Sequence, residues 1–360
     1  MESVTALIDK GALLHNIEVI QKKVGDAKII AVIKANGYGH GAIEVAKTLQ
    51  DRVVGFAVAR IGEAIELRKD GIENPIFLLE GVYSDDEVLL LEKYNLYTAV
   101  HDLNQLCSIE RAPIKEPIHV WLQVDIGMHR LGSDDPRVIS EIKSRLEHCD
   151  HVIKPIGLLS HLSVADTEGE EDYNAEEISN FFKFAKDMTG DLCLTNSAAI
   201  FRWKNAHTPW VRPGIVMYGI SPFEDVSAQD LDLIPVMTLK SKIIAIHNLK
   251  KGAKVGYGAY YVAPQDTTLG IVACGYGDGY PRTAPNGTPV YVNGRIARTA
   301  GHVCMDMLFV DLGVNSGDKI GDEVILWGRE VPVETVAKLC NTIPYELVCH
   351  VMPRVNFVYK

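Results

Sequence analysis

The residues whose types and spacing could do chemistry begin with Lys34, which follows an apolar run and precedes a glycine-rich turn. Residues 28–33 are mostly β-branched and do not alternate with polar residues, which is typical of a strand buried on both faces. Glycines at 37, 39 and 41 predict a turn in which the backbone approaches a ligand closely, before a helix begins near Ala42. Lys34 is therefore predicted at the carboxyl end of a buried strand, where the ordinary alternative is a solvated lysine.

Further polar groups follow later apolar runs in the same way: Arg130, His161, Asn196-Ser197 and Arg212-Pro213-Gly214. Singly, each has an ordinary explanation, namely a satisfied core histidine, surface ion pairs or a helix N-cap. If all of these groups lie at the same end of one sheet, their number and types indicate a functional site. Backbone amides around Ser197 and Gly214 are candidates for binding a phosphate.

The elements that must position these residues repeat as an apolar run, a turn and a helical stretch. The strand candidates are 28–33, 53–58, 75–79, 96–100, 118–124, 153–159, 192–195 and 211–218. The helix candidates include 42–49, 62–69, 85–93, 136–147 and 176–187. Eight units predict a (β/α)8 TIM-like barrel, whose active sites lie at the carboxyl ends of the strands. A doubly wound open sheet is the alternative fold, but that fold does not require eight strand-helix units.

Beyond residue 235 the chain is rich in β-type runs: 237–246, 270–274, 289–292, 295–299, 307–312 and 323–326. Asn293-Gly294 is a hairpin signal between two of them, and 333–340 has helical periodicity. We therefore predict an α/β chain with a barrel over residues 1–233 and a mostly-β C-terminal domain over 234–360.

Composition limits the function classes. The net charge of −11 over 360 residues disfavours nucleic acid and anionic membranes as partners. No apolar run approaches the roughly 18 residues of a spanning helix, and the start of the chain lacks a signal-peptide pattern, so we expect a cytoplasmic protein. The seven cysteines are scattered without a C-x-x-C pair, which predicts neither a disulfide framework nor a metal site.

Three stretches of the second half combine glycine, tyrosine and polar residues: 254–260, 275–280 and 301–306. Aromatic packing in hairpins is the ordinary explanation. With Lys34-Ala-Asn-Gly-Tyr-Gly-His-Gly41 and Arg212-Pro-Gly-Ile215, however, the stretches from Gly275 and Cys304-Met-Asp306 give the chain a nearly end-to-end resemblance to a known family. It resembles the fold-type III pyridoxal-phosphate enzymes and, within them, the alanine racemases. The last two motifs distinguish it from a single-domain pyridoxal-phosphate-binding relative.

The resemblance implies a cofactor, a reaction and an assembly. Lys34 would hold pyridoxal 5'-phosphate as a Schiff base and act as the base on the D-face of the substrate. Tyr257 would be the base on the L-face and would come from the other subunit of a homodimer. The reaction would interconvert L- and D-alanine for peptidoglycan synthesis, with the C-terminal domain contributing to the partner's active site.

The resemblance also implies roles for other residues. Those that bind the cofactor phosphate would be Tyr38, Ser197, Gly214 and Ile215. Arg212 would meet the pyridine nitrogen, and His161 would support the ring and couple through Arg212 to Tyr257. Arg130 and the Met305 amide would bind the substrate carboxylate, while Asp166 and Tyr276 would line the passage into the site. Because an isolated phenol ionises only near pH 10, positive charge from Arg212 and a charged His161 would assist Tyr257.

Two positions depart from the family pattern. Gln123 stands where many members carry a carbamylated lysine that orients the carboxylate-binding arginine, and a neutral glutamine gives no charge-assisted pair. Pro353 stands where a tyrosine usually narrows the passage. A wider pocket leaves open a serine or broad-specificity racemase. A non-catalytic pyridoxal-phosphate carrier and a decarboxylase of the same fold type are further alternatives.

Overall fold

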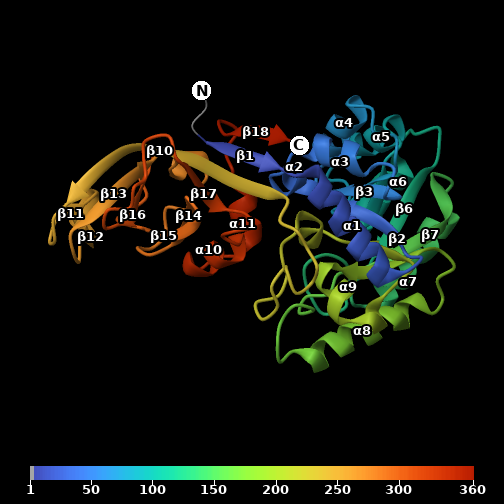
Figure 1. Ribbon diagram of the computed structural model, residues 1–360. Coiled ribbons are helices and arrows are strands. Elements are labelled where there is room, and N and C mark those ends of the chain that lie inside the picture. The colour runs from blue at the N-terminus through green and yellow to red at the C-terminus, as the bar shows by residue number, and fades with distance from the viewer. Residues whose placement is uncertain (1–3) are drawn as a thin grey trace. The chain divides into compact units, whose positions relative to one another are not determined.

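The structure, a computed structural model, describes residues 4–360, which divide into two compact units (Figure 1). We call Leu14–Met217 with Ser221–Asp232 the barrel domain. The β-domain comprises residues 4–13, Tyr218–Ile220 and Leu233–Lys360. Within the described residues no helix is both long and apolar enough to span a membrane.

The barrel domain contains a closed barrel of parallel strands, as the eight apolar runs predicted. Its strands are β2 (Lys28–Val32), β3 (Gly55–Val58), β4 (Ile76–Leu78), β5 (Tyr97–Val100), β6 (Ile118–Gln123), β7 (Val152–Leu159), β8 (Leu192–Asn196) and β9 (Trp210–Arg212). Pairing of Lys28 with Trp210 and of Ile29 with Val211 joins the first strand to the last. Strands β3 and β4 are buried throughout, because helices cover them outside and side chains fill the barrel inside.

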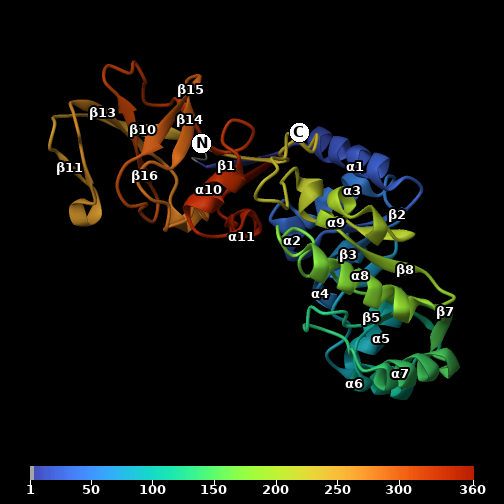
Figure 2. The same ribbon diagram turned by 90° about the horizontal axis from the view of Figure 1, so that it is seen from below.

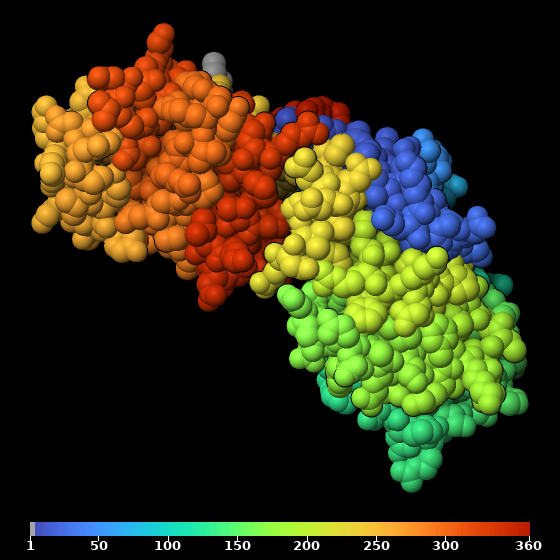
Figure 3. Space-filling view, turned by 60° about the horizontal axis from the view of Figure 1, so that its bottom comes forward, coloured from blue at the N-terminus to red at the C-terminus, as the bar shows by residue number. Residues whose placement is uncertain are grey.

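Helices surround these strands in Figures 1 and 2, and green and yellow-green segments that include α8 form much of the barrel domain's face in Figure 3. Their bounds are α1 (Lys10–Val24), α2 (Lys34–Tyr38), α3 (Ala42–Leu49), α4 (Ile61–Lys69), α5 (Asp85–Lys93), α6 (Leu103–Arg111), α7 (Pro136–His148), α8 (Glu171–Ala185) and α9 (Ser197–Arg202). Short 3-10 turns cover Lys204–Ala206 (η1) and Ile215–Tyr218 (η2). Helix α1 begins in the β-domain and continues into the barrel domain.

Aromatic side chains fill part of the barrel's interior. The ring of Phe77 contacts those of Trp121 and Trp210 edge to face, with centroids 5.6 and 5.9 Å apart. These residues belong to β4, β6 and β9, which are not neighbours in the barrel, so the contacts cross its interior. A Cβ at Gly157 would lie 2.4 Å from the Trp121 ring. The barrel is therefore a packed core whose chemistry is confined to its ends.

The β-domain contains an eight-stranded sheet in the order β13-β16-β15-β14-β17-β10-β1-β18, with a further pairing between β13 and β10. The strands are β1 (Thr5–Ile8), β10 (Met237–Leu249), β13 (Thr267–Val272), β14 (Pro289–Val292), β15 (Arg295–Thr299), β16 (Leu308–Gly313), β17 (Glu323–Trp327) and β18 (Asn356–Tyr359). A separate ribbon joins β11 (Lys254–Val255) to β12 (Tyr261–Val262). Its helical segments are η3 (Tyr257–Ala259), η4 (Tyr276–Asp278), α10 (Val333–Leu339) and α11 (Pro344–Cys349).

The N-terminal strand differs from the expectation that residues 1–233 form the barrel. Strand β1 pairs antiparallel with β10 and parallel with β18, both in the β-domain. Its alternating burial suits the surface of an antiparallel sheet rather than a fully buried barrel strand. A four-residue strand far from its partners in sequence carries too little pattern to reveal which sheet it joins.

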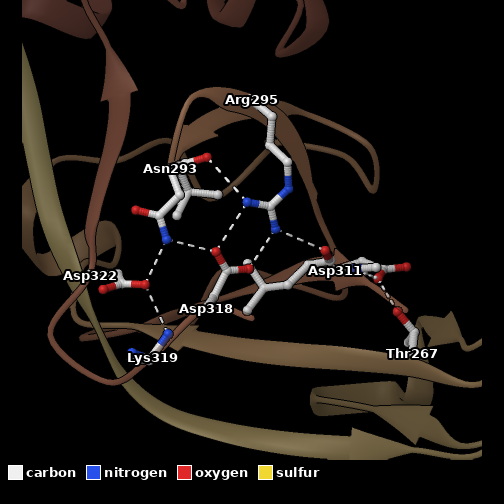
Figure 4. A network of polar contacts seen from close by, with 10 residues as sticks. Thr267, Asn293, Arg295, Asp311, Asp318, Lys319 and Asp322 are labelled. Atoms are coloured by element: carbon white, nitrogen blue, oxygen red, sulfur yellow. Dashed lines mark hydrogen bonds and ion pairs between the residues drawn. The ribbon is translucent and has the colours of Figure 1, made fainter. Parts of the chain in front are cut away.

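The hairpin predicted at Asn293-Gly294 joins β14 to β15, and both residues have positive φ, of 44° and 81°. A polar network holds this hairpin (Figure 4). The Asn293 amide donates to Asp318 Oδ1 at 2.8 Å, and Arg295 Nη1 donates to the same oxygen at 3.0 Å. The Asp318 carboxylate is 1% exposed. Burial alone would raise its pKa, but hydrogen bonds from Arg295 and Asn293 bring the pKa below its usual value of 3.8.

We expect Asp318→Asn to lower the free energy of unfolding of the β-domain by about 1–3 kcal/mol at pH 7, because Arg295 loses a charged, buried acceptor. A carboxylate with a depressed folded-state pKa stabilises above its unfolded-state pKa and loses this effect as the pH falls through the folded-state value. The difference between wild type and variant should therefore shrink on acidification below about pH 4. Urea unfolding at several pH values measures it, with the exposed Glu330→Gln as control. A difference independent of pH would contradict this account.

Candidate active site

Lys34 begins a turn of unusual handedness at the carboxyl end of β2. Ala35, Asn36 and Gly37 have φ of 51°, 53° and 63°, and Tyr38 has φ of 51°. Four successive residues thus adopt the left-handed helical conformation, which costs a non-glycine residue about 1–2 kcal/mol. The sequence predicted a glycine turn before a helix at Ala42, and α3 does begin there. It did not predict that two of the strained residues would be alanine and tyrosine.

The structure brings four predicted site residues together near the strand ends. Positive charges on Arg212, Arg130 and Lys34 all act on His161, which follows β7. Removal from water, together with these charges in that order, lowers the pKa of His161 well below 6.5. Burial and these neighbouring charges thus favour the neutral form of His161, whereas the charged His161 that the resemblance implies stays a prediction. The sequence placed the cations at one barrel end, but their effect on His161 depends on spatial distances that strand counting does not supply.

Arg212 is fixed by the backbone of neighbouring strands. Its Nη1 donates to the Cys193 carbonyl at 2.7 Å and lies 3.0 Å from the Cys193 sulfur. Its Nη2 donates to the carbonyl of Ser160. The guanidinium is buried at the end of β9, and burial raises the pKa of the Cys193 thiol, so this sulfur is a neutral neighbour. Hydrogen bonds to two backbone carbonyls thus fix the orientation of the Arg212 guanidinium before a ligand binds.

Tyr38, Ser197 and Gly214 form a cradle from three separate segments. The Gly214 amide donates to Ser197 Oγ at 2.8 Å. A Cβ at Gly214 would lie 2.8 Å from Tyr38 Oη and 3.8 Å from Ser197 Oγ. Ser197 begins α9, whose N-cap Asn196 accepts a hydrogen bond from the Ala199 amide at 3.0 Å. Ile215 follows directly, at the start of η2. Two hydroxyls and backbone amides converging on a side-chain-free position suit a phosphate.

We expect Gly214→Ala to weaken phosphate binding, because the new methyl group would enter the cradle and push Tyr38 aside. The approach of 2.8 Å lies inside van der Waals contact, and loss of one hydrogen bond to a charged group corresponds to about a tenfold change or more in affinity. Fluorescence titration with pyridoxal 5'-phosphate and with inorganic phosphate measures the change. Gly62→Ala, at a position where nothing lies within 4 Å of the new Cβ, is the control. Unchanged affinity would remove Gly214 from the cradle.

Arg130 lies in the loop after β6, whose shape Asp125 determines. The Asp125 carboxylate accepts hydrogen bonds from the amides of Gly127 and His129, at 2.9 and 3.1 Å, and pairs with the His129 ring at 3.3 Å. Sequence reasoning missed Asp125, although Asp-x-Gly is a signal for such a turn. Among the described residues, Gln123 Oε1 is buried without a hydrogen-bond partner.

Two loops of the β-domain carry Tyr276 and Met305, and they interlock. The Tyr276 amide donates to the Cys304 carbonyl at 3.0 Å, and the Gly277 amide donates to the Met305 carbonyl at 2.8 Å. Arg354, which sequence reasoning did not single out, pairs with Asp278 at 2.7 Å and with Asp306 at 2.9 Å. It thereby ties both loops to the C-terminal segment.

Tyr257 lies in η3, between β11 and β12, and is 73% exposed. Met305 is 54% and Tyr276 40% exposed. Asp166, in the barrel domain, is also exposed. The predicted residues of the β-domain therefore present their side chains to the surface of that domain.

A closed (β/α)8 barrel with a cationic cluster and a cradle of hydroxyl and amide groups at its strand ends, in a chain with a second, mostly-β domain, defines a class of two-domain barrel enzymes. Within that class, residues 8–222 match the family described as "Alanine racemase, N-terminal domain" and residues 236–359 match "Alanine racemase, C-terminal domain". The chain belongs to the alanine racemase family.

Individual relatives agree over the full length. Alanine racemase from Vibrio parahaemolyticus is 48% identical over 359 residues, which cover 100% of this chain and 99% of the relative. The crystal structure of biosynthetic alanine racemase from Pseudomonas aeruginosa has a TM-score of 0.96 and 39% identity, with 100% of each chain covered. That of alanine racemase from E. faecalis has a TM-score of 0.90 and 30% identity, covering 100% of this chain and 98% of its own.

Proposed function

We propose that this chain is a pyridoxal-phosphate-dependent racemase that interconverts L- and D-alanine. The observation that carries the proposal is the convergence of Lys34, Arg212 and the Tyr38, Ser197 and Gly214 cradle in a chain similar over its full length to alanine racemases. Each part of the cofactor has a matching group. The cradle suits its phosphate, Lys34 supplies the amine that binds it covalently, and Arg212 is available to its ring nitrogen.

When bound, pyridoxal phosphate withdraws electrons from the substrate's α-carbon and so makes the α-hydrogen removable. Inversion then requires two bases, because the proton leaves one face and a proton arrives on the other. Lys34 Nζ serves the D-face and Tyr257 Oη the L-face. Arg130 and the Met305 amide hold the substrate carboxylate, and Asp166 and Tyr276 line the approach.

Arg212 has two consequences for this chemistry. A guanidinium does not give up its proton in proteins, so an Arg212 placed at the ring nitrogen of the cofactor would leave that nitrogen unprotonated, which would weaken the ring as an electron sink and restrain side reactions. Arg212 also lies close enough to His161 for its charge to favour the neutral imidazole. His161 would support the cofactor ring.

The same proposal includes a homodimer with shared active sites. A catalytic tyrosine works best in a site shielded from bulk water, yet Tyr257 is mostly exposed on the β-domain. Contact with a second copy would cover Tyr257, Met305 and Tyr276 and bring them to the partner's Lys34.

A second candidate substrate is serine. Pro353 is exposed and lacks the hydroxyl and the bulk of the tyrosine usual in the family. A pocket that admits alanine rejects a side chain with one added hydroxyl by only about 100-fold unless it is shaped to do so. D-Alanine supply for peptidoglycan completes the proposal, and the seven free cysteines suit the reducing cytoplasm.

Chiral chromatography after incubation with pyridoxal phosphate and L-alanine, L-serine or L-lysine tests the function. We expect kcat/KM for alanine to exceed that for serine by about tenfold or more. Faster turnover of serine would favour the second candidate. Cofactor binding without α-hydrogen exchange in deuterated water would indicate a non-catalytic carrier, and release of carbon dioxide a decarboxylase.

A further inference from the structure

The left-handed turn after Lys34 needs external support. Ala35, Asn36 and Tyr38 each pay a steric penalty in this conformation, and isolated chains avoid it. Backbone hydrogen bonds inside the turn, from Gly37 to the Ile33 carbonyl at 2.8 Å and from Gly39 to the Ala35 carbonyl at 3.0 Å, exist only once the turn has formed. The left-handed conformation therefore depends on side chains that bind the turn from outside and stabilise it relative to other backbone conformations.

Glu63, near the start of α4, contacts the turn from outside at the residue after Lys34. Its Oε1 accepts a hydrogen bond of 2.7 Å from the Ala35 amide, the first amide after the lysine. Its Oε2 accepts hydrogen bonds from the amides of Ala59 and Arg60, both at 3.0 Å. One carboxylate thus joins the turn after β2 to the turn after β3.

Helix capping explains only half of this arrangement. A glutamate at the third helical position that reaches back to the N-cap amide is a standard N-terminal cap, and Oε2 fulfils that role toward Arg60. The contact from Oε1 to Ala35 reaches 28 residues back in the sequence and gives nothing to α4. A hydrogen bond from an amide to a carboxylate is also stronger than one between neutral groups.

Two other side chains act farther along the turn. Asn36 Oδ1 accepts from the Ala42 amide at 3.0 Å, and His40 Nδ1 donates to the Tyr38 carbonyl at 2.8 Å. Burial lowers the pKa of His40 from 6.5 to about 4, so its ring stays neutral at neutral pH. These contacts fix the end of the turn that carries Tyr38, whereas Glu63 fixes the end that carries Lys34.

We propose that Glu63 is a positioning residue for Lys34: its carboxylate holds the Ala35 amide, selects the left-handed turn and so sets the direction in which the lysine side chain leaves the strand. The importance of that direction rests on the proposed function, in which Lys34 binds the cofactor and transfers protons. The hydrogen bond from the Ala35 amide to Glu63, by contrast, does not depend on a bound cofactor.

The test compares Glu63→Ala with Asp102→Ala. Asp102 caps α6 in the same barrel domain, accepting from the Gln105 amide at 2.8 Å, so its loss removes a helix cap without touching the turn at Lys34. Amide hydrogen exchange of residues 34–41 in the cofactor-free protein is the first measurement. Titration with pyridoxal 5'-phosphate and separate determination of kcat and KM follow.

We expect Glu63→Ala to speed exchange in residues 34–41 and to weaken cofactor binding, each by about tenfold or more, as for loss of a hydrogen bond to a charged group. It should lower kcat more than it raises KM, and Asp102→Ala should leave these quantities unchanged. Glu63→Gln, which retains one acceptor oxygen and its size, should fall between wild type and Glu63→Ala, and it decides the question if Glu63→Ala does not fold.

Exchange and cofactor affinity in the Glu63 variants equal to those of Asp102→Ala would overturn the proposal and leave Glu63 as a helix cap alone. Failure of the proposed function has a different signature, because the wild-type protein would then bind no pyridoxal phosphate or leave alanine unchanged. Amide exchange of residues 34–41 reports on the hydrogen bond between Ala35 and Glu63 whether or not the proposed function is correct.

Discussion

Lys34→Ala is expected to abolish racemisation and the visible absorbance of the covalently bound cofactor. The variant loses the amine that binds the cofactor and one of the two proposed bases, and a single positioned acid-base group already contributes about 100- to 10,000-fold. Activity in both directions should therefore fall by at least that factor. Absorbance spectroscopy and chiral chromatography measure the two losses.

The matched control is Lys47→Ala, which removes a lysine of α3 that pairs with Asp70 at 3.0 Å on the surface. It should retain both absorbance and activity. Because the cradle of Tyr38, Ser197 and Gly214 is intact in Lys34→Ala, that variant should still bind pyridoxal phosphate reversibly. Retention of the covalent spectrum in Lys34→Ala would refute the role assigned to Lys34.

Tyr257→Phe is expected to separate the two faces of the reaction. Without the phenol, proton transfer on the L-face should fall by about 100- to 10,000-fold, while Lys34 still exchanges the α-hydrogen of D-alanine. In deuterated water the variant should therefore label D-alanine without producing L-alanine at a comparable rate. Mass spectrometry after chiral separation distinguishes labelling from inversion.

Tyr260→Phe is the control, because Tyr260 is half-exposed three residues away and stacks on His302 with ring centroids 4.1 Å apart. It should keep near wild-type activity in both directions. Full activity of Tyr257→Phe from L- to D-alanine would show that the second base is another group.

The same two variants test whether sites are shared between subunits. If Lys34 and Tyr257 of one site come from different chains, a heterodimer of Lys34→Ala and Tyr257→Phe has one intact site and one doubly altered site. Equal mixing of the inactive variants with subunit exchange should then restore about a quarter of wild-type activity. Absence of any restoration, with exchange of subunits verified, would argue that both bases come from one chain.

Much of this site was predictable because parallel strands impose simple rules. Short, mainly apolar runs identified the eight barrel strands, and the residues after them fall at one end by topology alone. Lys34, His161 and Arg212 follow from that rule. Glycine and asparagine at positive φ identified the turns at 37 and 293 for local steric reasons.

Other features depend on partners distant in sequence. The assignment of β1 to the β-domain required its pairing with β10 and β18. Arg354 acquires its role only from Asp278 and Asp306, 76 and 48 residues away in the chain by their numbering, and no local pattern marks either pair. Glu63 has a local signature, but that signature predicts a helix cap and not the hydrogen bond to Ala35.

The sequence by itself determined the barrel, the β-domain and the residue types of the candidate site, because periodicity, turn chemistry and strand ends are local properties. Tertiary structure alone decided the left-handed path of the chain after Lys34, the hydrogen bond that Glu63 makes to it and the lowered pKa of His161. Backbone strain persists only where surrounding contacts impose it, and a pKa responds to charges at distances that folding sets. The lysine was visible in the sequence, whereas its orientation and electrostatic surroundings were not.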